Sequence, residues 1–277
     1  MTSEILEHTT AVTAAPDEPA APRKWGPLTG FVRDLGSLNQ LLSQTMHYVM
    51  RGRVDRAAVL AASYSAGNGS MLFITVTMTV VGMITIMQAG LQTQQVIPEL
   101  SMLGATMIQL LAREFAPTVC ALMLATRVGA GVAAEIGSMV VTDQVDALRM
   151  CGADPVDYLV VPRFLASIIM TVALAWWSLF VSVAAGSVVA NLVFDINYGT
   201  FINFNLAGLG DLAVMSIKAV TYGAAIPIVS AHRGLNTFGG SEGVGWATTN
   251  AVVHSSVAII FLDLVLSVLG YIVFPPV

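Results

Sequence analysis

The chain has 277 residues, of which 56% are hydrophobic and only 10% are charged. About a quarter of the residues in a soluble globular domain are charged, so this composition excludes an ordinary water-soluble protein and predicts an all-α polytopic membrane protein. The net charge is −5, and we expect no nucleic-acid partner. The two cysteines, Cys120 and Cys151, do not have the spacing of metal ligands, so no metal site is predicted.

Residues 1–22 are rich in Ala, Thr, Pro and Glu and have neither a basic start nor an apolar core. This composition is typical of a disordered tail rather than a signal peptide. We expect this tail to lie in the cytoplasm.

Residues 23–66 are predicted to form an interfacial amphipathic region before the first membrane span. Within it, SLNQLLSQTMHYV (37–49) is too short and too polar to cross a bilayer. Its apolar residues recur at helical spacing, and Ser37 is suited to begin a helix. One interpretation is a helix lying in the cytoplasmic interface of the membrane, and the alternative is a helix packed on the transmembrane bundle. The apolar stripe consists of Leu38, Leu41, Leu42, Met46 and Val49.

Residues 67–277 are predicted to form a membrane domain of about five transmembrane helices. Each apolar segment is long enough to cross about 30 Å of hydrocarbon as a helix. The second and fourth are interrupted by charged residues and are the least regular. The five segments are 70–91, 100–136, 164–194, 209–231 and 246–274.

Basic residues lie on only one side of this predicted topology. They occur before the first span and in the loops after the second and fourth spans, whereas the opposite loops and the C-terminal end have none. By the positive-inside rule the N-terminus is cytoplasmic and, with five spans, the C-terminus lies outside. We therefore expect a multi-pass protein of the cytoplasmic (inner) membrane. The loop and N-terminal basic residues are Arg23, Lys24, Arg33, Arg51, Arg53, Arg56, Arg149, Arg163 and Arg233.

The loop between the second and third spans, TDQVDALRMCGADPVDYLVVPR (142–163), is unusually polar for this chain. Val141, Val145 and Leu148 lie on one face of a helix, which predicts a short amphipathic helix near 141–151. Such a stripe must be covered either by the underside of the protein itself or by a partner. The loop is therefore expected to be ordered.

The second half of this loop has the residues of a tight turn. Gly152 suits the position just after a helix, where a positive φ is needed. Asp154 followed by Pro155 is typical of the beginning of the next helix. The sequence thus predicts helix, turn and helix in succession.

Several charged residues fall inside the predicted spans, and four of them are candidates for an intramembrane cluster: Arg113, Glu114, Lys218 and Asp263. An isolated charge in the middle of a bilayer is costly, so intramembrane ions are paired or functional. Two positive and two negative groups can neutralise one another in a bundle. A structural cluster of ion pairs and a relay for protons or lipid headgroups both remain open.

The second span has a small residue at every fourth position: Ala125, Gly129, Ala133 and Gly137. These residues form one face of a helix, and small side chains allow a second helix to approach closely within a membrane. We expect tight helix packing along this face.

The run EFAPTVCALMLATRVGAGVAAEIGSMVVTDQVDALRMCGADPVDYLVVPR (114–163) resembles the MlaE-type permease family. A second block, ATTNAVVHSSVAIIFLDLVLSVL (247–269), is similar to the last span of that family, and the resemblance covers about residues 37–274. Family members are membrane subunits of lipid-transporting ABC systems that work with MCE proteins. The actinobacterial members are called YrbE, and we expect this chain to belong to that branch. One departure is Thr142-Asp143-Gln144-Val145, where Thr-Glu-Gln followed by Ile or Leu is often expected.

The resemblance implies that the polar loop is a coupling helix, which docks into a groove of a cytoplasmic ABC ATPase. ATP and Mg would be bound by that ATPase, because this chain has only two lysines and no Gly-Lys-Ser/Thr phosphate loop. The chain itself is then not an enzyme and holds no cofactor. The expected coupling residues are Thr142, Asp143, Gln144, Val145, Asp146, Leu148 and Arg149.

The resemblance also implies the other partners. Two permease chains are expected side by side, as a heterodimer if the actinobacterial branch is correct, with MCE-domain proteins on the outer side. The cargo would be a hydrophobic lipid moving between the cytoplasmic membrane and those proteins. Whether it is a phospholipid, a fatty acid or a sterol, and in which direction it moves, stays open.

An ion-coupled secondary transporter that uses Glu114, Lys218 and Asp263 is the alternative function. Many such transporters contain an internal repeat, and none is evident in this sequence. An intramembrane enzyme is a third possibility, but no nucleophile elbow or HExxH motif supports it.

Overall fold

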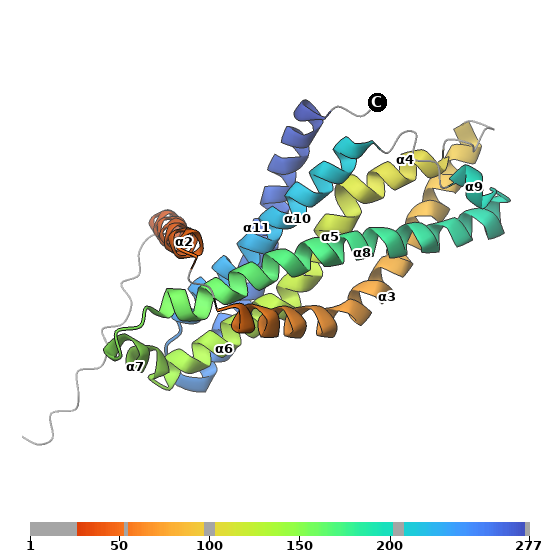
Figure 1. Cartoon of the computed structure of the whole chain (residues 1–277). Helices are drawn as coiled ribbons and strands as arrows, with labels where there is room; N and C mark the ends of the chain where they lie inside the picture. Colours follow the sequence, from red (N-terminus) through yellow and green to blue (C-terminus); the bar gives the residue numbers. More distant parts are fainter. Residues whose placement is uncertain (1–26, 53–54, 97–102, 202–207, 275–277) are drawn as a thin grey trace, which may run out of the picture. The chain divides into compact units, whose positions relative to one another are not determined.

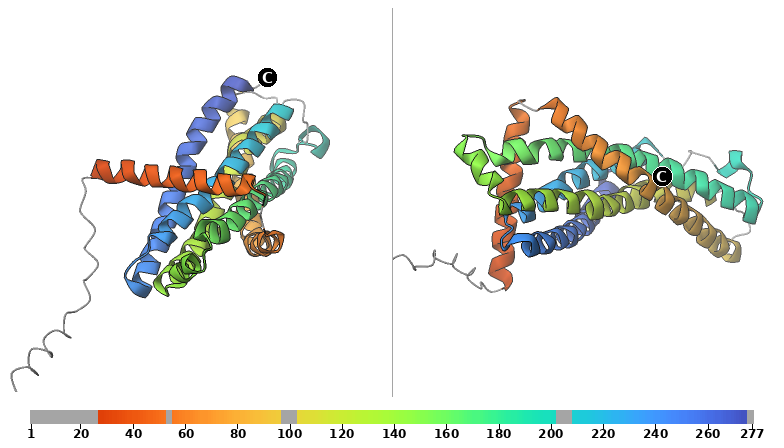
Figure 2. Two further views of the ribbon diagram at one scale, coloured as in Figure 1. Left: turned by 60° about the vertical axis from the view of Figure 1, so that its left-hand side comes forward. Right: turned by 90° about the horizontal axis from the view of Figure 1, so that it is seen from below.

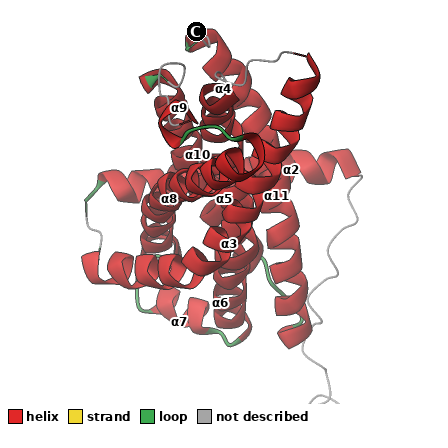
Figure 3. Ribbon diagram, turned by 90° about the vertical axis from the view of Figure 1, so that its right-hand side faces the viewer, coloured by secondary structure: helices red, strands yellow, loops and turns green. Residues whose placement is uncertain are grey.

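The computed structural model describes residues 27–52, 55–96, 103–201 and 208–274. Within these ranges all regular structure is helical and there is no strand (Figure 3). The chain divides into two units, Met1–Ser37 and Leu38–Val277. The tail predicted for residues 1–22 lies outside the described residues.

The first described helix, α2 (Pro27–Met50), contains the predicted amphipathic stretch but begins earlier than predicted. Ser37 does not begin the helix, since its Oγ donates a hydrogen bond to the carbonyl of Asp34 at 2.9 Å inside it. No residue between Pro27 and Ser37 is a proline that would break the helix, so the earlier start is sterically permitted.

The apolar stripe of α2 is divided between two environments. Leu41 and Thr45 are buried, and Leu38 and Val49 pack with Leu41 against a cluster that includes Ile136. The neighbouring Leu42 and Met46 are 37% and 45% exposed. The helix from Leu38 onward therefore packs on the bundle with one face and leaves an adjoining apolar edge uncovered. Its position in the membrane interface stays a prediction.

Among the described residues, five helices are long and apolar enough to cross a membrane, which confirms the predicted number. The first, α3 (Arg56–Val96), runs without interruption through the predicted domain boundary at residue 66, so that boundary lies inside a helix. The spans are Arg56–Gln94, Leu103–Val141, Val156–Phe194, Leu209–Leu235 and Gly240–Val273.

The second span is one run of helix interrupted by two π-helical segments. A π-helical turn holds more residues than an α-helical turn, so each segment changes the face that the following helix presents to its neighbours. The segments carry the charged residues Arg113, Glu114 and Arg127. The run consists of α4 (Leu103–Leu110), η1 (Leu111–Phe115), α5 (Ala116–Leu124), η2 (Ala125–Gly129) and α6 (Ala130–Val141).

The other described elements follow in chain order and complete the bundle. They are α7 (Gln144–Met150), η3 (Val156–Val160), α8 (Val161–Phe194), α9 (Tyr198–Phe201), α10 (Leu209–Leu235) and α11 (Gly240–Val273). Helix α8 packs along α3 on one side and α10 on the other, and α10 also contacts α6 and α11 (Figures 1 and 2).

Glycines bring these helices close together. A Cβ at Gly82 of α3 would lie 2.4 Å from the carbonyl oxygen of Ser182 on α8, so only glycine permits this approach. On the predicted small-residue face, a Cβ at Gly129 would lie 2.9 Å from Ser230 Oγ of α10. A Cβ at Gly137 would lie 2.9 Å from Thr237 Oγ1, directly after α10. Tight packing along this face is confirmed.

Candidate functional site

The centre of the candidate site is Lys218 on α10, whose side chain is fully buried. Its Nζ lies 2.8 Å from Glu114 Oε2 in η1 and 2.9 Å from Asp263 Oδ1 on α11. It also donates a hydrogen bond of 2.7 Å to Ser267 Oγ. The structure thus brings together three of the four predicted intramembrane ions, from three different helices.

Lys218 makes one further bond that depends on a proline. Pro117, at the start of α5, has no N–H to donate to the carbonyl of Arg113 four residues earlier. That carbonyl instead accepts a hydrogen bond of 2.9 Å from Lys218 Nζ. The ammonium therefore helps to satisfy a backbone group that the helix itself leaves open, as membrane interiors require.

Both carboxylates that contact Lys218 also have other hydrogen-bond partners. Asp263 Oδ1 accepts hydrogen bonds from Tyr222 Oη at 2.6 Å and from Thr118 Oγ1 at 3.0 Å. Ser267 Oγ lies 3.1 Å from both carboxylate oxygens of Glu114. Side-chain hydroxyl groups from three helices therefore surround the two carboxylates that contact this lysine.

The fourth predicted ion, Arg113, pairs elsewhere. Its Nε contacts Asp211 Oδ1 on α10, and its guanidinium also donates to the carbonyl of Phe274 at 2.6 Å. Asp211 is buried, and its second oxygen accepts from the backbone N–H of Gly208 at 3.0 Å, which caps the start of α10. Sequence reasoning missed Asp211, although it lies seven residues before Lys218 and therefore on the same face of the helix.

Asp211 changes the charge balance of the cluster. Two cations, Arg113 and Lys218, face three carboxylates, those of Glu114, Asp211 and Asp263, so the described cluster carries a formal charge of −1. Among the described residues, no group of three or more His, Cys, Asp and Glu side chains is arranged to hold a metal ion.

The network borders a groove of about 630 Å³ between the α4–η1 segment and α11. Glu114 is the most exposed member of the network, with 38% of its side chain exposed, whereas Lys218 is completely enclosed. The groove is mostly apolar, and Arg113 and Glu114 provide its charged side chains. It is lined by Thr106, Met107, Gln109, Leu110, Arg113, Glu114, Ser267, Val268, Tyr271 and Ile272.

The second candidate region is α7 (Gln144–Met150), which joins the second and third spans. Asp143 precedes it in the left-handed conformation, with φ of 57°. Asp146 and Arg149 form an ion pair of 2.8 Å, and Gly152 has the positive φ, 76°, predicted for the turn. The sequence pattern thus specified this turn correctly.

The apolar stripe of α7 is turned inward. Val145 is only 4% exposed, and Leu148 is half-buried, so the protein's own chain covers the stripe in large part. Met150, which sequence reasoning did not select, is 87% exposed. The polar residues of the outward face are Thr142, Asp143, Gln144, Asp146 and Arg149, and Ala147 is exposed as well.

The end of α2 is hydrogen-bonded to the turn after α7. Tyr48 Oη donates a hydrogen bond of 2.6 Å to Asp154 Oδ2. The other oxygen of Asp154 accepts from the backbone N–H of Val156 at 2.9 Å, as predicted for a residue at a helix start. The bond to Asp154 raises the pKa of the Tyr48 hydroxyl above its usual value, because it favours the protonated phenol.

Comparison with known proteins identifies the family of the chain. The family described as permease MlaE matches residues 59–269. The chain belongs to this family. A probable ABC transporter permease protein of Synechocystis is 39% identical over 235 residues, which cover 82% of this chain and 87% of the relative.

Two further relatives extend the MlaE comparison to other organisms. The protein TRIGALACTOSYLDIACYLGLYCEROL 1, chloroplastic, of Arabidopsis thaliana is 31% identical over 269 residues, which cover 96% of this chain and 76% of the relative. A probable ABC transporter permease protein of Rickettsia conorii is 31% identical over 243 residues, covering 87% and 93%. An ABC transporter permease is a membrane subunit, so membership implies a partner ATPase. The actinobacterial branch stays a prediction.

Proposed function

We propose that this MlaE-family chain is the permease subunit of an ATP-driven lipid transporter, which moves hydrophobic lipids between the cytoplasmic membrane and MCE-domain proteins. The observation that carries the proposal is the groove beside Glu114. It joins an apolar wall to Glu114, the most exposed carboxylate of an ion network whose lysine is completely enclosed. An amphiphile needs this combination, because its acyl chains require apolar contacts and its headgroup requires polar ones.

The names of the relatives support the same function. Two of them are named as ABC transporter permeases, and the name of the Arabidopsis relative contains that of a galactolipid built on diacylglycerol. These names favour an ATP-driven lipid permease over the ion-coupled secondary transporter.

In this proposal α7 is the coupling helix. Its stripe residue Val145 anchors it to the protein, while Asp143, Gln144, Asp146 and Arg149 present a polar surface to the ATPase. ATP and Mg are bound by that partner. The ion pair between Asp146 and Arg149 supports a rigid surface rather than a loose loop.

The proposed assembly places the N-terminus and α7 in the cytoplasm and the C-terminus outside, as the distribution of basic residues favours. MCE proteins then meet the end of the bundle opposite α7. A second permease chain, different from this one in a heterodimer, supplies the rest of the lipid path. Helix α11 supports such a partner, because only 11% of its most apolar window is buried within the chain.

The test is lipid transfer by the purified complex in proteoliposomes that contain fluorescent phospholipid, with an acceptor MCE protein outside. We expect transfer that requires ATP and a hydrolysing ATPase, and that falls when Glu114→Leu removes the headgroup contact. Transfer driven by an ion gradient without ATP would instead establish the secondary transporter. Absence of any lipid transfer would reject the lipid function.

A further inference from the structure

A second cavity, of about 960 Å³, lies between α3, η2–α6 and the beginning of α8. Its wall on α3 consists of small residues at helical spacing, so no large side chain from this helix fills it. Gly131 leaves it open on α6, since a Cβ there would meet no atom within 4 Å. The α3 wall consists of Ala58, Ala61, Ala62, Ser65 and Ala66.

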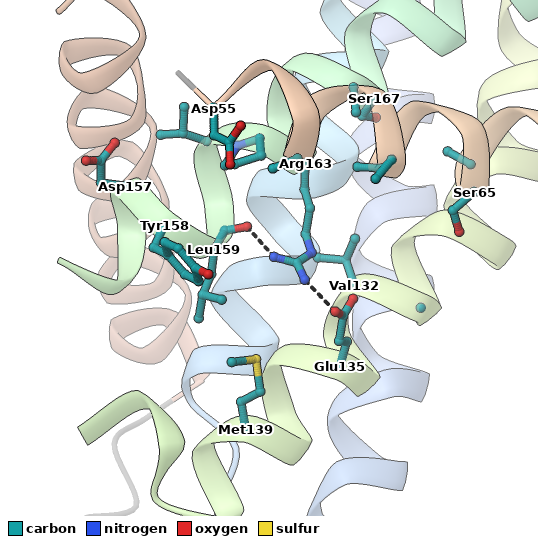
Figure 4. A pocket seen from close by; sticks show the side chains of 18 of the residues that line it. Asp55, Ser65, Val132, Glu135, Met139, Asp157, Tyr158, Leu159, Arg163 and Ser167 are labelled. Atoms are coloured by element: carbon teal, nitrogen blue, oxygen red, sulfur yellow. Dashed lines mark hydrogen bonds and ion pairs between the residues drawn. The ribbon is translucent and has the colours of Figure 1, made fainter. Parts of the chain in front are cut away.

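One of the two arginines in this cavity is already neutralised. Arg163 donates to Glu135 Oε1 at 2.5 Å and to the carbonyl of Leu159 at 2.7 Å, as Figure 4 shows. Its charge is therefore compensated within the protein.

The other arginine, Arg127, has no such partner. Within the described part of the chain, it forms no ion pair and no hydrogen bond, although it lies in a membrane-spanning helix and its side chain is exposed. A Cβ at Gly69 of α3 would lie 2.0 Å from one of its guanidinium nitrogens. Because Gly69 has no side chain, the guanidinium of Arg127 can lie between α3 and the second span at this position.

The acidic residues of the cavity are Glu135, which pairs with Arg163, and three aspartates. Asp55 stands at the beginning of α3, 14 positions before Gly69, which corresponds to about 21 Å along a helix. Asp154 and Asp157 come from the turn before α8. One end of the cavity is thus acidic, and the other holds an uncompensated cation.

The depth of Arg127 fits a lipid headgroup. The span Leu103–Val141 has 39 residues and is about 58 Å long, so a helix centred on about 30 Å of hydrocarbon places Arg127 roughly 7 Å inside the boundary on the α7 side. An arginine at this level reaches the phosphate layer of the nearer leaflet. Glu114 lies about 20 Å away along the same helix, towards the opposite leaflet.

We propose that this cavity is a second lipid site, in which Arg127 binds the phosphate of a glycerophospholipid from the leaflet on the α7 side. The planar guanidinium offers a phosphate two parallel hydrogen bonds. The alanine wall lies on the α7 side of Gly69 and leaves room for the headgroup, for which Ser65 and Ser167 provide hydroxyls. The acyl chains extend from the level of Arg127 towards the middle of the bilayer. This inference rests on the proposed function and names its substrate class.

The test is native mass spectrometry of the full-length protein titrated separately with phosphatidylglycerol, with diacylglycerol of the same chains, and with inorganic phosphate. We expect binding of phosphatidylglycerol but not of the other two. Arg127→Gln should weaken it about ten-fold, since a charge-assisted bond is lost. Arg127→Lys should weaken it less, because lysine keeps the charge but not the two parallel hydrogen bonds. Gly131→Phe should abolish it by filling the cavity, whereas Gly245→Phe, at an equally open glycine of α11 outside the cavity, should not.

Four results would overturn the inference. These are unchanged binding in Arg127→Gln, equal losses in the two glycine variants, equal binding of diacylglycerol, and displacement of the lipid by inorganic phosphate at similar concentration. A change of oligomeric state in Arg127→Gln would assign the residue to a protein interface and would also overturn it. If the wild-type complex transfers lipid with ATP and any of these results is obtained, this site is rejected but the proposed function is not. If the wild-type complex transfers no lipid, the proposed function itself is rejected.

Discussion

Lys218 and Glu114 form an ion pair of 2.8 Å between residues 104 positions apart in the sequence. The pair joins α10 to η1, and the contact of the same ammonium with Asp263 adds α11. Three spans thus meet at one cation that is completely enclosed, while one of its partners, Glu114, reaches the groove. The same network therefore fixes the packing of the bundle and provides the accessible carboxylate of the proposed lipid path.

Replacing Lys218 by Met should destabilise the protein strongly. Two carboxylates lose their cation, and removing one partner of a buried ion pair costs about 3–5 kcal/mol. Thermal unfolding in detergent, followed by size-exclusion chromatography, measures the effect.

The matched control for this variant is the triple substitution Lys218→Met, Glu114→Gln and Asp263→Asn, which removes the charges together. It should recover most of the stability, because neutral amides can keep hydrogen bonds to Tyr222 and Thr118. Lys218→Met with the stability of the wild type would contradict a structural role for the network.

Cys151 is a natural reporter of membrane orientation, because it is exposed next to α7 while the other cysteine, Cys120, is buried. A membrane-impermeant maleimide should label Cys151 in inside-out vesicles and leave intact cells unlabelled. Cys151→Ser provides the background, since Cys120 remains. Labelling of intact cells would place α7 outside and would refute both the predicted topology and a cytoplasmic ATPase partner.

The outward face of α7 should determine binding of the ATPase. Asp146→Arg together with Met150→Asp changes exposed residues only, so we expect an inserted, folded protein that no longer copurifies with the ATPase. Leu148 is unsuitable for this test, because it is half-buried and its replacement would disturb the protein itself. Glu242→Arg reverses an exposed charge outside α7 and serves as the control. Full copurification of the double variant would argue against a coupling role.

The bond between Tyr48 and Asp154 should be visible in the titration of the phenol. Asp154 raises the pKa of Tyr48 above 10.0, so the bond stabilises the folded protein below that pH and the contribution is lost as the pH rises through the higher folded value. Asp154→Asn should move the titration to lower pH. Ultraviolet difference spectra, with Tyr48→Phe subtracted, measure it; an unchanged titration in Asp154→Asn would show that the bond does not form.

The sequence was sufficient to predict the five spans, because hydropathy alone distinguishes them. It did not give their ends: α3 begins at Arg56, well before the apolar stretch at 70–91, since alanine-rich polar turns continue a helix without a change in geometry. The association of Arg113 with Asp211 rather than with Glu114 or Asp263 depends on how α10 is rotated in the bundle. No spacing within one helix determines that rotation.

The sequence also did not determine that the apolar stripe of α7 faces the protein itself. An amphipathic pattern such as Val141, Val145 and Leu148 shows that a face is covered, but not by which molecule. The role assigned to α7 in ATPase binding stays a prediction, and so does a relay for protons or lipid headgroups through the ion network.

The two π-helical segments make the second span sensitive to length rather than to composition. Deleting one residue from Ala125–Gly129 would return that turn to α-helical geometry and rotate α6 by about 100° relative to α5. The small-residue face of α6 would then no longer pack on α10, and Glu135 would no longer reach Arg163. None of these contacting residues would itself have been replaced. A single-codon deletion at this point should therefore disrupt the protein more severely than most substitutions in the same turn.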